Sequence, residues 1–244
     1  MSSSKQPDRR AFLKGLGTVG ATGVAAIVSA DAVAEPHATP SPAAAAPTQP
    51  AETAHAYIFL SPPEAAFIEA AVDRLIPADD LSPSGTDSGV ATFIDRQLAG
   101  AWGSGDRLYM QGPWRKGTPT QGYQLPMTPA QFVRAGIAEA NAHCRRTYQR
   151  EFDRLSREQQ IALLQELEQG AVPLGTLPSE QFFGLLLNLT MQGFFADPIY
   201  GGNRNKVAWK MIGFPGVIAI YSEHIKTYQN KRYDVEPMSI VDLL

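Results

Sequence analysis

The chain has 244 residues, of which 21 are basic and 24 acidic, so its formal net charge is −3. No dense basic cluster occurs, which excludes nucleic acid as a partner. The single cysteine, Cys144, excludes an intramolecular disulfide, a cysteine-held iron–sulfur cluster and C-x-x-C-H attachment of a c-type haem. Hydrophobic residues make up 44% of the chain, enough for one core.

The first 34 residues have the layout of an export signal. Basic and apolar side chains open it, followed by a mild apolar run at residues 15–29 and an A-x-A cleavage pattern at 32–34. The run is too short for a transmembrane helix, which needs ~20 residues. The paired arginines and the low hydrophobicity predict twin-arginine export, a route for folded cargo. The alternative is an ordinary export signal that contains two arginines. The signal residues are Arg9, Arg10, Phe12, Leu13 and Lys14.

Removal of residues 1–34 from the 244 would leave a mature chain of 210 residues. Residues 35–56 are rich in Pro and Ala without apolar periodicity, which predicts a flexible leader. The remaining residues, 57–244, are expected to form one folded domain. The signal predicts that this domain lies in the periplasm.

Apolar spacing and start signals predict an all-α fold: a single irregular helical domain with long aromatic-rich loops. Strand signals are few. The fifth helix is apolar almost all round, so we expect it to be central and buried. The expected helices cover residues 62–75, 90–98, 128–148, 156–167, 178–195 and 217–230.

Residues 100–127 fit no period and contain Trp102, Tyr109 and Trp114 among glycines and prolines. A long irregular loop in a compact domain is usually functional. Exposed Trp and Tyr favour protein interfaces. The alternative is that these aromatic side chains fold back and cap their own core.

Residues 192–216 mix polar and aromatic side chains around a turn at Gly201-Gly202. This composition predicts a recognition or packing loop. The alternative is a turn that caps the preceding helix and satisfies buried backbone groups. The residues of interest are Asp197, Tyr200, Asn203, Arg204, Lys206 and Trp209.

No catalytic constellation stands out. His143 and His224 are single residues on predicted helices, and the motifs of zinc peptidases, serine hydrolases and phosphate-binding loops are absent. We therefore expect no catalytic, cofactor or metal site in this chain. Cys144 shares the apolar stripe of its helix, which favours a buried thiol, but its neighbours His143, Arg145 and Arg146 need solvent or partners.

Two stretches carry a family resemblance: FLSPPEAAFIEAAVDRLIPADDLSPSGTDSGVATFIDRQLAG at residues 59–100 and QGFFADPIYGGNRNKVAWKMIGFPG at 192–216. Together with the export signal, they resemble subunit 3 of gluconate 2-dehydrogenase. This is the small or gamma subunit of membrane-bound, FAD-dependent sugar and sugar-acid dehydrogenases. The late stretch is the more specific of the two.

The resemblance implies a heterotrimer in which an FAD subunit oxidises the substrate and a multihaem cytochrome c subunit passes electrons to ubiquinone. The small subunit would carry no cofactor, would help the FAD subunit to fold and to cross the membrane, and would sit at the periplasmic face of the inner membrane. Gluconate, 2-ketogluconate, fructose, glucose and sorbitol all remain open as substrates. The expected partner interface is Trp102, Tyr109, Trp114, Cys144, Asp197, Tyr200, Asn203, Arg204, Lys206 and Trp209.

Three further hypotheses stay open at this stage. An interchain disulfide through Cys144 is a minority hypothesis beside the buried thiol. A periplasmic sugar-binding module would use Trp102, Trp114 and Asp197. A free-standing enzyme would act through Asp197, Asn203 and Lys206.

Overall fold

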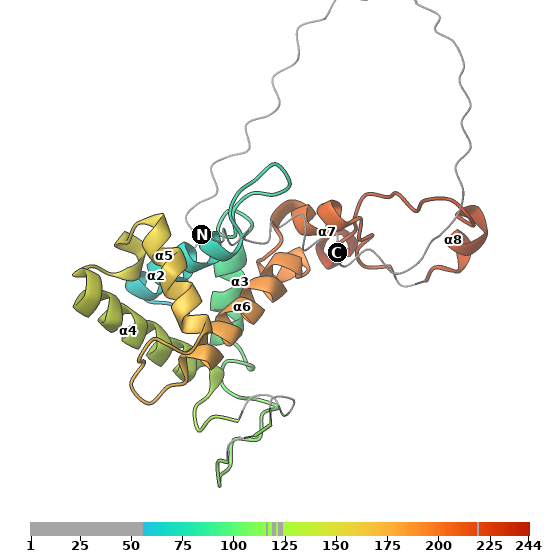
Figure 1. Cartoon of the computed structure of the whole chain (residues 1–244). Helices are drawn as coiled ribbons and strands as arrows, with labels where there is room; N and C mark the ends of the chain where they lie inside the picture. The colour runs from blue at the N-terminus through green and yellow to red at the C-terminus, as the bar shows by residue number, and fades with distance from the viewer. Residues whose placement is uncertain (1–55, 116, 119–120, 122–123, 219) are drawn as a thin grey trace, which may run out of the picture. The chain divides into compact units, whose positions relative to one another are not determined.

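Helices joined by turns and irregular segments make up the described part of the chain, and no strand occurs in it (Figure 1). The computed structural model describes residues 56–115, 117, 118, 121, 124–218 and 220–244. The predicted signal and all but the last residue of the predicted leader lie outside these residues. The all-α prediction is confirmed. The helices are α2 Pro62–Leu75, α3 Val90–Ala99, α4 Pro129–Tyr148, α5 Arg157–Glu168, α6 Ser179–Phe195, α7 Val207–Ile212 and α8 Ser222–Thr227, with 3-10 turns η1 Phe152–Arg154, η2 Pro198–Tyr200, η3 Arg204–Lys206 and η4 Ile240–Leu243.

Local capping sets where the predicted helices begin. At the start of α4, Gln131 N donates to Thr128 Oγ1 at 3.3 Å, and Thr128 N donates to Gln131 Oε1 at 2.9 Å. Ser156 and Gln159 make the same reciprocal pair before α5, at 3.0 and 3.3 Å. Each pair satisfies backbone donors that the first helical turn cannot use. These two starts therefore follow directly from the sequence.

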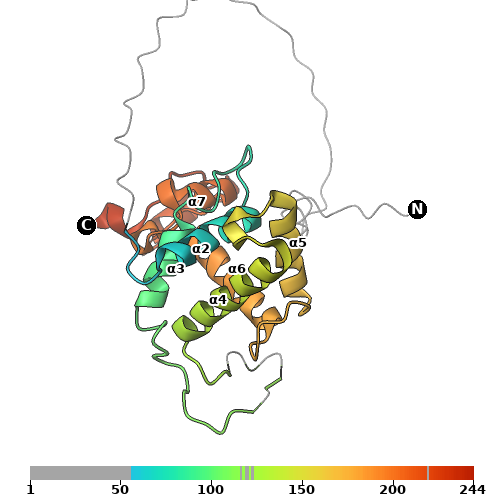
Figure 2. The ribbon, with the colours of Figure 1, turned by 90° about the vertical axis from the view of Figure 1, so that its left-hand side faces the viewer.

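Helix α6 is the central element of the fold. It contacts α2, α3, α4, α5 and α7, and it runs between the other helices in both views (Figures 1 and 2). Its buried side chains include Phe182, Leu186, Leu189 and Phe194. One face still meets solvent at Gln181, Asn188 and Gln192, so α6 is central but not buried all round.

A cluster of phenylalanine rings joins α6 to its neighbours. The Phe67 ring of α2 lies 4.6 Å from the Phe152 ring of η1 and 6.3 Å from the Phe182 ring of α6. The Phe132 ring of α4 meets Phe182 edge-on at 6.3 Å. Gly136 of α4 faces the same Phe182 ring, and a Cβ there would overlap it. Close packing of this kind fixes the distance between α4 and α6.

A buried carboxylate anchors the chain just before α2. Asp95 of α3 is 2% exposed, and its oxygens accept the backbone N–H groups of Ile58, Phe59 and Leu60 at 2.8, 2.8 and 2.9 Å. Arg134 of α4 adds to the anchor: its Nη2 donates to Phe59 O at 2.9 Å. The segment that precedes α2 is therefore tied to both α3 and α4.

The predicted helix at residues 217–230 is wrong: only the short α8 forms there. Gly216 instead takes a left-handed φ of 83° and pairs with Met238. Val217 N donates to Met238 O at 2.7 Å, and Met238 N donates to Pro215 O at 3.0 Å. The β-branched residues that follow Gly216 have low helix propensity, so this extended pairing wins. Sequence reasoning also missed α7, which lies inside the stretch that it treated as a loop.

Candidate partner-binding surfaces

The irregular segment 100–127 is divided between the core and the surface. No helix or strand forms in its described residues. Ala130 N donates to Gly103 O at 3.1 Å, which ties the base of the segment to α4. The Trp102 side chain packs against the core, whereas Trp114 is exposed and Tyr109 is 80% exposed. Trp102 thus fits the capping alternative, and Tyr109 and Trp114 remain available to a partner.

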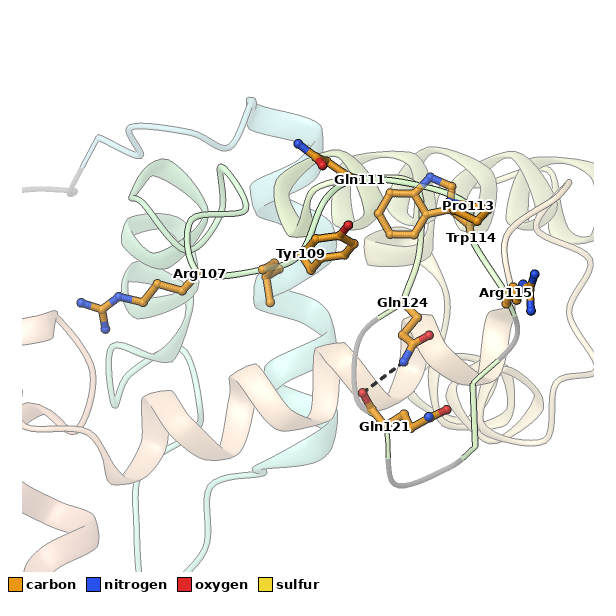
Figure 3. A pocket seen from close by; sticks show the side chains of 9 residues that line it. Arg107, Tyr109, Gln111, Pro113, Trp114, Arg115, Gln121 and Gln124 are labelled. Atoms are coloured by element: carbon orange, nitrogen blue, oxygen red, sulfur yellow. Dashed lines mark hydrogen bonds between the residues drawn. The ribbon is translucent and has the colours of Figure 1, made fainter.

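Part of this segment curls around a hollow of about 380 Å³ (Figure 3). In Figure 3 the Tyr109 and Trp114 rings lie on one side of the hollow, and Gln124 lies across from them with its hydrogen bond to Gln121. Among the described lining residues there is no carboxylate or imidazole. The lining residues are Arg107, Leu108, Tyr109, Gln111, Pro113, Trp114, Arg115, Gln121 and Gln124.

The Asn203 side chain joins α6 to α7. It has no exposed surface, its Nδ2 donates to Ala196 O at 2.9 Å, and its Oδ1 accepts from Ala208 N at 2.9 Å. Its φ of 46° is left-handed, a conformation that Asn tolerates better than most residues. Asn203 therefore caps the end of one helix and the start of the next, as the packing alternative predicted.

Asp197 and Trp209 use their polar atoms within the chain as well. Asp197 Oδ1 accepts from Ile199 N at 3.0 Å, and its Oδ2 accepts from Ile240 N at 2.9 Å. Trp209 is buried, and its Nε1 donates to Phe195 O at 2.9 Å. Both side chains therefore make contacts within the chain, and their place in a partner interface stays a prediction.

Lys206 and Arg204 hold the late loop to other parts of the chain. Lys206 Nζ lies 2.8 Å from Asp242 Oδ2, and hydrogen bonding to this ammonium lowers the pKa of Asp242 to about 2. Arg204 N donates to Ser88 O at 3.0 Å, beside the start of α3. Tyr200 is exposed. Of the predicted interface residues in the late loop, only Tyr200 offers a largely open side chain.

These contacts bear on the enzyme hypothesis and on the sugar-binding hypothesis. Asp197, Asn203 and Lys206 are close in the chain, but each is engaged in a structural contact, so they form no catalytic set. Trp102 and Trp114 belong to the segment that follows the C-terminal end of α3. The Asp197 loop runs along α3: Arg204 N donates to Ser88 O just before the helix, and Arg96 Nη1 in its last turn donates to Ile199 O at 3.5 Å. The sugar-binding hypothesis stays a prediction for calorimetry on the isolated chain.

Cys144 lies in the core. Its side chain is 0% exposed, and burial, together with the nearby Glu151 carboxylate, raises the pKa of the thiol to about 11. The structure shows the buried alternative for Cys144, and its contact with a partner stays a prediction. An interchain disulfide would require the end of α4 to move, and it stays a prediction for non-reducing electrophoresis of the complex.

The largest group of exposed apolar side chains lies where sequence reasoning did not look for it. Fifteen large hydrophobic residues are exposed in the described part of the chain, and nine of them follow residue 211. None of the nine was among the predicted interface residues. Three of them, Ile220, Tyr221 and Ile225, lie within residues 217–230, where the sequence predicted a helix. The run of aliphatic and tyrosine residues from 217 to 221 does not by itself distinguish a helix from an exposed loop. The nine are Ile212, Phe214, Ile220, Tyr221, Ile225, Met238, Val241, Leu243 and Leu244.

The described residues contain neither a metal-binding group nor a membrane-spanning helix. No group of three or more His, Cys, Asp or Glu side chains in these residues is placed to hold a metal ion. Among the same residues, no helix combines the length and the apolar content that a membrane crossing needs. The structure thus defines a helical protein in which the polar side chains of the late loop make contacts within the chain.

The family model described as gluconate 2-dehydrogenase subunit 3 matches residues 62–216. This is more than half of the chain, so the protein belongs to the gluconate 2-dehydrogenase subunit 3 family and is a small subunit of a multi-subunit dehydrogenase. The match runs from the start of α2 to the pairing of Gly216 with Met238, and it leaves residues 217–244 outside. Comparisons with curated proteins and with solved structures gave no match.

Proposed function

We propose that this chain is the non-catalytic small subunit of a periplasmic, FAD-dependent dehydrogenase of the gluconate 2-dehydrogenase type. It stabilises the FAD-containing catalytic subunit and carries it through twin-arginine export. FAD belongs to that catalytic subunit and haem c to a multihaem cytochrome c subunit, which attaches the complex to the inner membrane. The observation that carries the proposal is the family match over residues 62–216.

The contacts of Asp197, Asn203 and Lys206 support a non-catalytic role. Asp197 and Asn203 hold backbone groups, and Lys206 is paired with Asp242. A catalytic acid or base must be placed to reach a substrate. Here each of these groups already has an internal partner, and its removal would cost fold stability first.

The export role depends on Arg9 and Arg10. A twin-arginine signal transports cargo that has already folded, so one signal serves two proteins that are bound to each other. In cells that express the complex, Arg9→Lys together with Arg10→Lys should leave the catalytic flavoprotein in the cytoplasm. Fractionation followed by a dye-linked dehydrogenase assay measures this. Flavoprotein in the periplasm of the double variant would contradict the shared signal.

The catalytic assignment has its own test. The purified chain alone should not oxidise gluconate or another sugar acid with a dye acceptor, whereas the chain purified with its flavoprotein should. Turnover by the isolated chain would make it an enzyme in its own right. Calorimetric binding of a sugar to the isolated chain would favour the sugar-binding module.

A further inference from the structure

The segment after α7 forms a closed loop with almost no core of its own. We name residues 217–237 the C-terminal loop. It is closed where Gly216 pairs with Met238, and Lys210 Nζ lies 2.6 Å from Glu236 Oε1 beside this closure. Among its described residues only Pro237 is buried. In Figure 1 the segment runs out from α7 to α8 and returns to α7.

An aromatic cluster gives the C-terminal loop a defined shape. The Tyr233 ring lies 4.6 Å from the Tyr228 ring, at right angles to it, and 6.4 Å from the Tyr221 ring. The His224 ring of α8 lies 5.3 Å from Tyr233. These contacts join α8 to the returning half of the loop, so the loop presents its remaining side chains from a formed scaffold.

The loop exposes three large apolar side chains among its polar ones. Ile220 and Ile225 are each 69% exposed, and Tyr221 is exposed beside them. Phe214 and Met238, beside the closure, are exposed as well. Exposed apolar patches rimmed by polar residues mark interaction sites, and aromatic residues are enriched in protein interfaces.

The charge of the C-terminal loop indicates what kind of partner covers it. The loop has three basic residues, Lys226, Lys231 and Arg232, and three acidic ones, Glu223, Asp234 and Glu236. Binding to a lipid surface draws on an excess of Lys and Arg, which this loop lacks. A neutral apolar patch with tyrosines fits a folded protein partner, and the family match makes the chain a subunit with such partners.

We propose that the C-terminal loop is the docking element for the FAD-containing catalytic subunit, with Ile220 and Ile225 as its apolar anchors. The inference rests on the proposed function. It adds that the partner is bound through residues outside the family-matched range of 62–216. The aromatic cluster holds the loop in shape before binding, which lowers the entropy cost of association.

The test is recovery of the flavoprotein on the full chain, co-expressed with the catalytic subunit and quantified by flavin content. Ile225→Glu should lower recovery about tenfold or more, because it removes an aliphatic anchor and places a charge in the interface. Ile220→Glu should do the same. The matched control is Met191→Glu: Met191 is 38% exposed on α6, lies outside the C-terminal loop, and should leave recovery unchanged.

Thermal melting of each variant separates docking from folding, because neither Ile220 nor Ile225 belongs to the buried core. Equal recovery by the wild-type chain and both loop variants would overturn the docking inference and leave the proposed function standing. Failure of the wild-type chain to recover any flavoprotein would overturn both. Unchanged recovery with lost self-association or lost vesicle binding would assign the loop to a second copy or to lipid, and would also overturn it.

Discussion

The anchor at Asp95 gives a prediction whose size can be worked from the structure. In Asp95→Asn, an amide nitrogen replaces one carboxylate oxygen. The remaining oxygen can still accept two of the three backbone N–H groups of residues 58–60, but the third N–H then faces another donor. Asp95 is 2% exposed, so solvent cannot readily replace the lost acceptor.

The expected cost follows from the energetics of buried hydrogen bonds. A hydrogen bond to a charged group contributes about 1.5–3 kcal/mol, and an unsatisfied buried donor costs about 1–3 kcal/mol. We therefore expect Asp95→Asn to lower the free energy of unfolding by about 3 kcal/mol. For a domain of this size, 1 kcal/mol shifts the melting temperature by about 2–4 °C, so Tm should fall by about 6–12 °C.

Calorimetry or circular dichroism melting of the full chain measures the shift. The matched control is Asp79→Asn. Asp79 Oδ1 accepts from Leu81 N at 2.9 Å and from Ser82 N at 3.0 Å, but in an exposed turn that Asn also suits. The control should change stability by less than about 0.5 kcal/mol. If the two variants melt within about 2 °C of each other, the anchor contributes little and the reasoning is refuted.

Three other predictions concern packing, reactivity and charge. Gly136→Ala should destabilise the chain by about 1–3 kcal/mol in urea unfolding, since its methyl group overlaps a core phenylalanine ring. Gly184→Ala, on an exposed face of α6 where an added Cβ would meet nothing within 4 Å, should instead stabilise the chain by about 0.5–1 kcal/mol. A change of the same sign in the free energy of unfolding of both variants would contradict the packing. Cys144, with its pKa raised to about 11, should react with iodoacetamide only after unfolding, and rapid labelling of the native chain would show an open thiol. The Asp242 carboxyl should titrate by NMR with a midpoint near 2 instead of its ordinary 3.8. Its ion pair with Lys206 is then complete above about pH 4 and is lost as the pH falls through 2. A midpoint at the ordinary value would mean that the pair does not form.

The helical framework could be predicted because its signals are local. Caps such as Thr128 with Gln131 and Ser156 with Gln159 fix helix starts within four residues of sequence. The apolar pattern of residues 178–195 also predicted a central helix. Such signals depend on neighbouring residues, which the sequence displays directly.

The roles of the late-loop residues depend on distant partners. Asp197 accepts a hydrogen bond from Ile240, and Lys206 pairs with Asp242, more than 30 residues away. Their polar side chains predicted a recognition or packing loop, with a helix-capping turn as the alternative. The tertiary contacts favour packing, and no local pattern contained that information.

In the C-terminal loop, by contrast, the sequence predicted a helix where the structure has an exposed loop. A short apolar run after Gly216 predicted a packed helix, yet the pairing with Met238 turns the chain outward and leaves Ile225 exposed. A contact between residues 22 positions apart decided the outcome. Exposure therefore could not be predicted from the composition of the run.

The central claim is that this chain brings a flavoprotein to the periplasm and is itself non-catalytic. The most direct measurement locates the catalytic flavoprotein in cells that lack this chain, in cells that express all of it, and in cells that express it without residues 1–34. The account predicts periplasmic flavoprotein only with the full chain. Flavoprotein that reaches the periplasm equally in all three strains would contradict it.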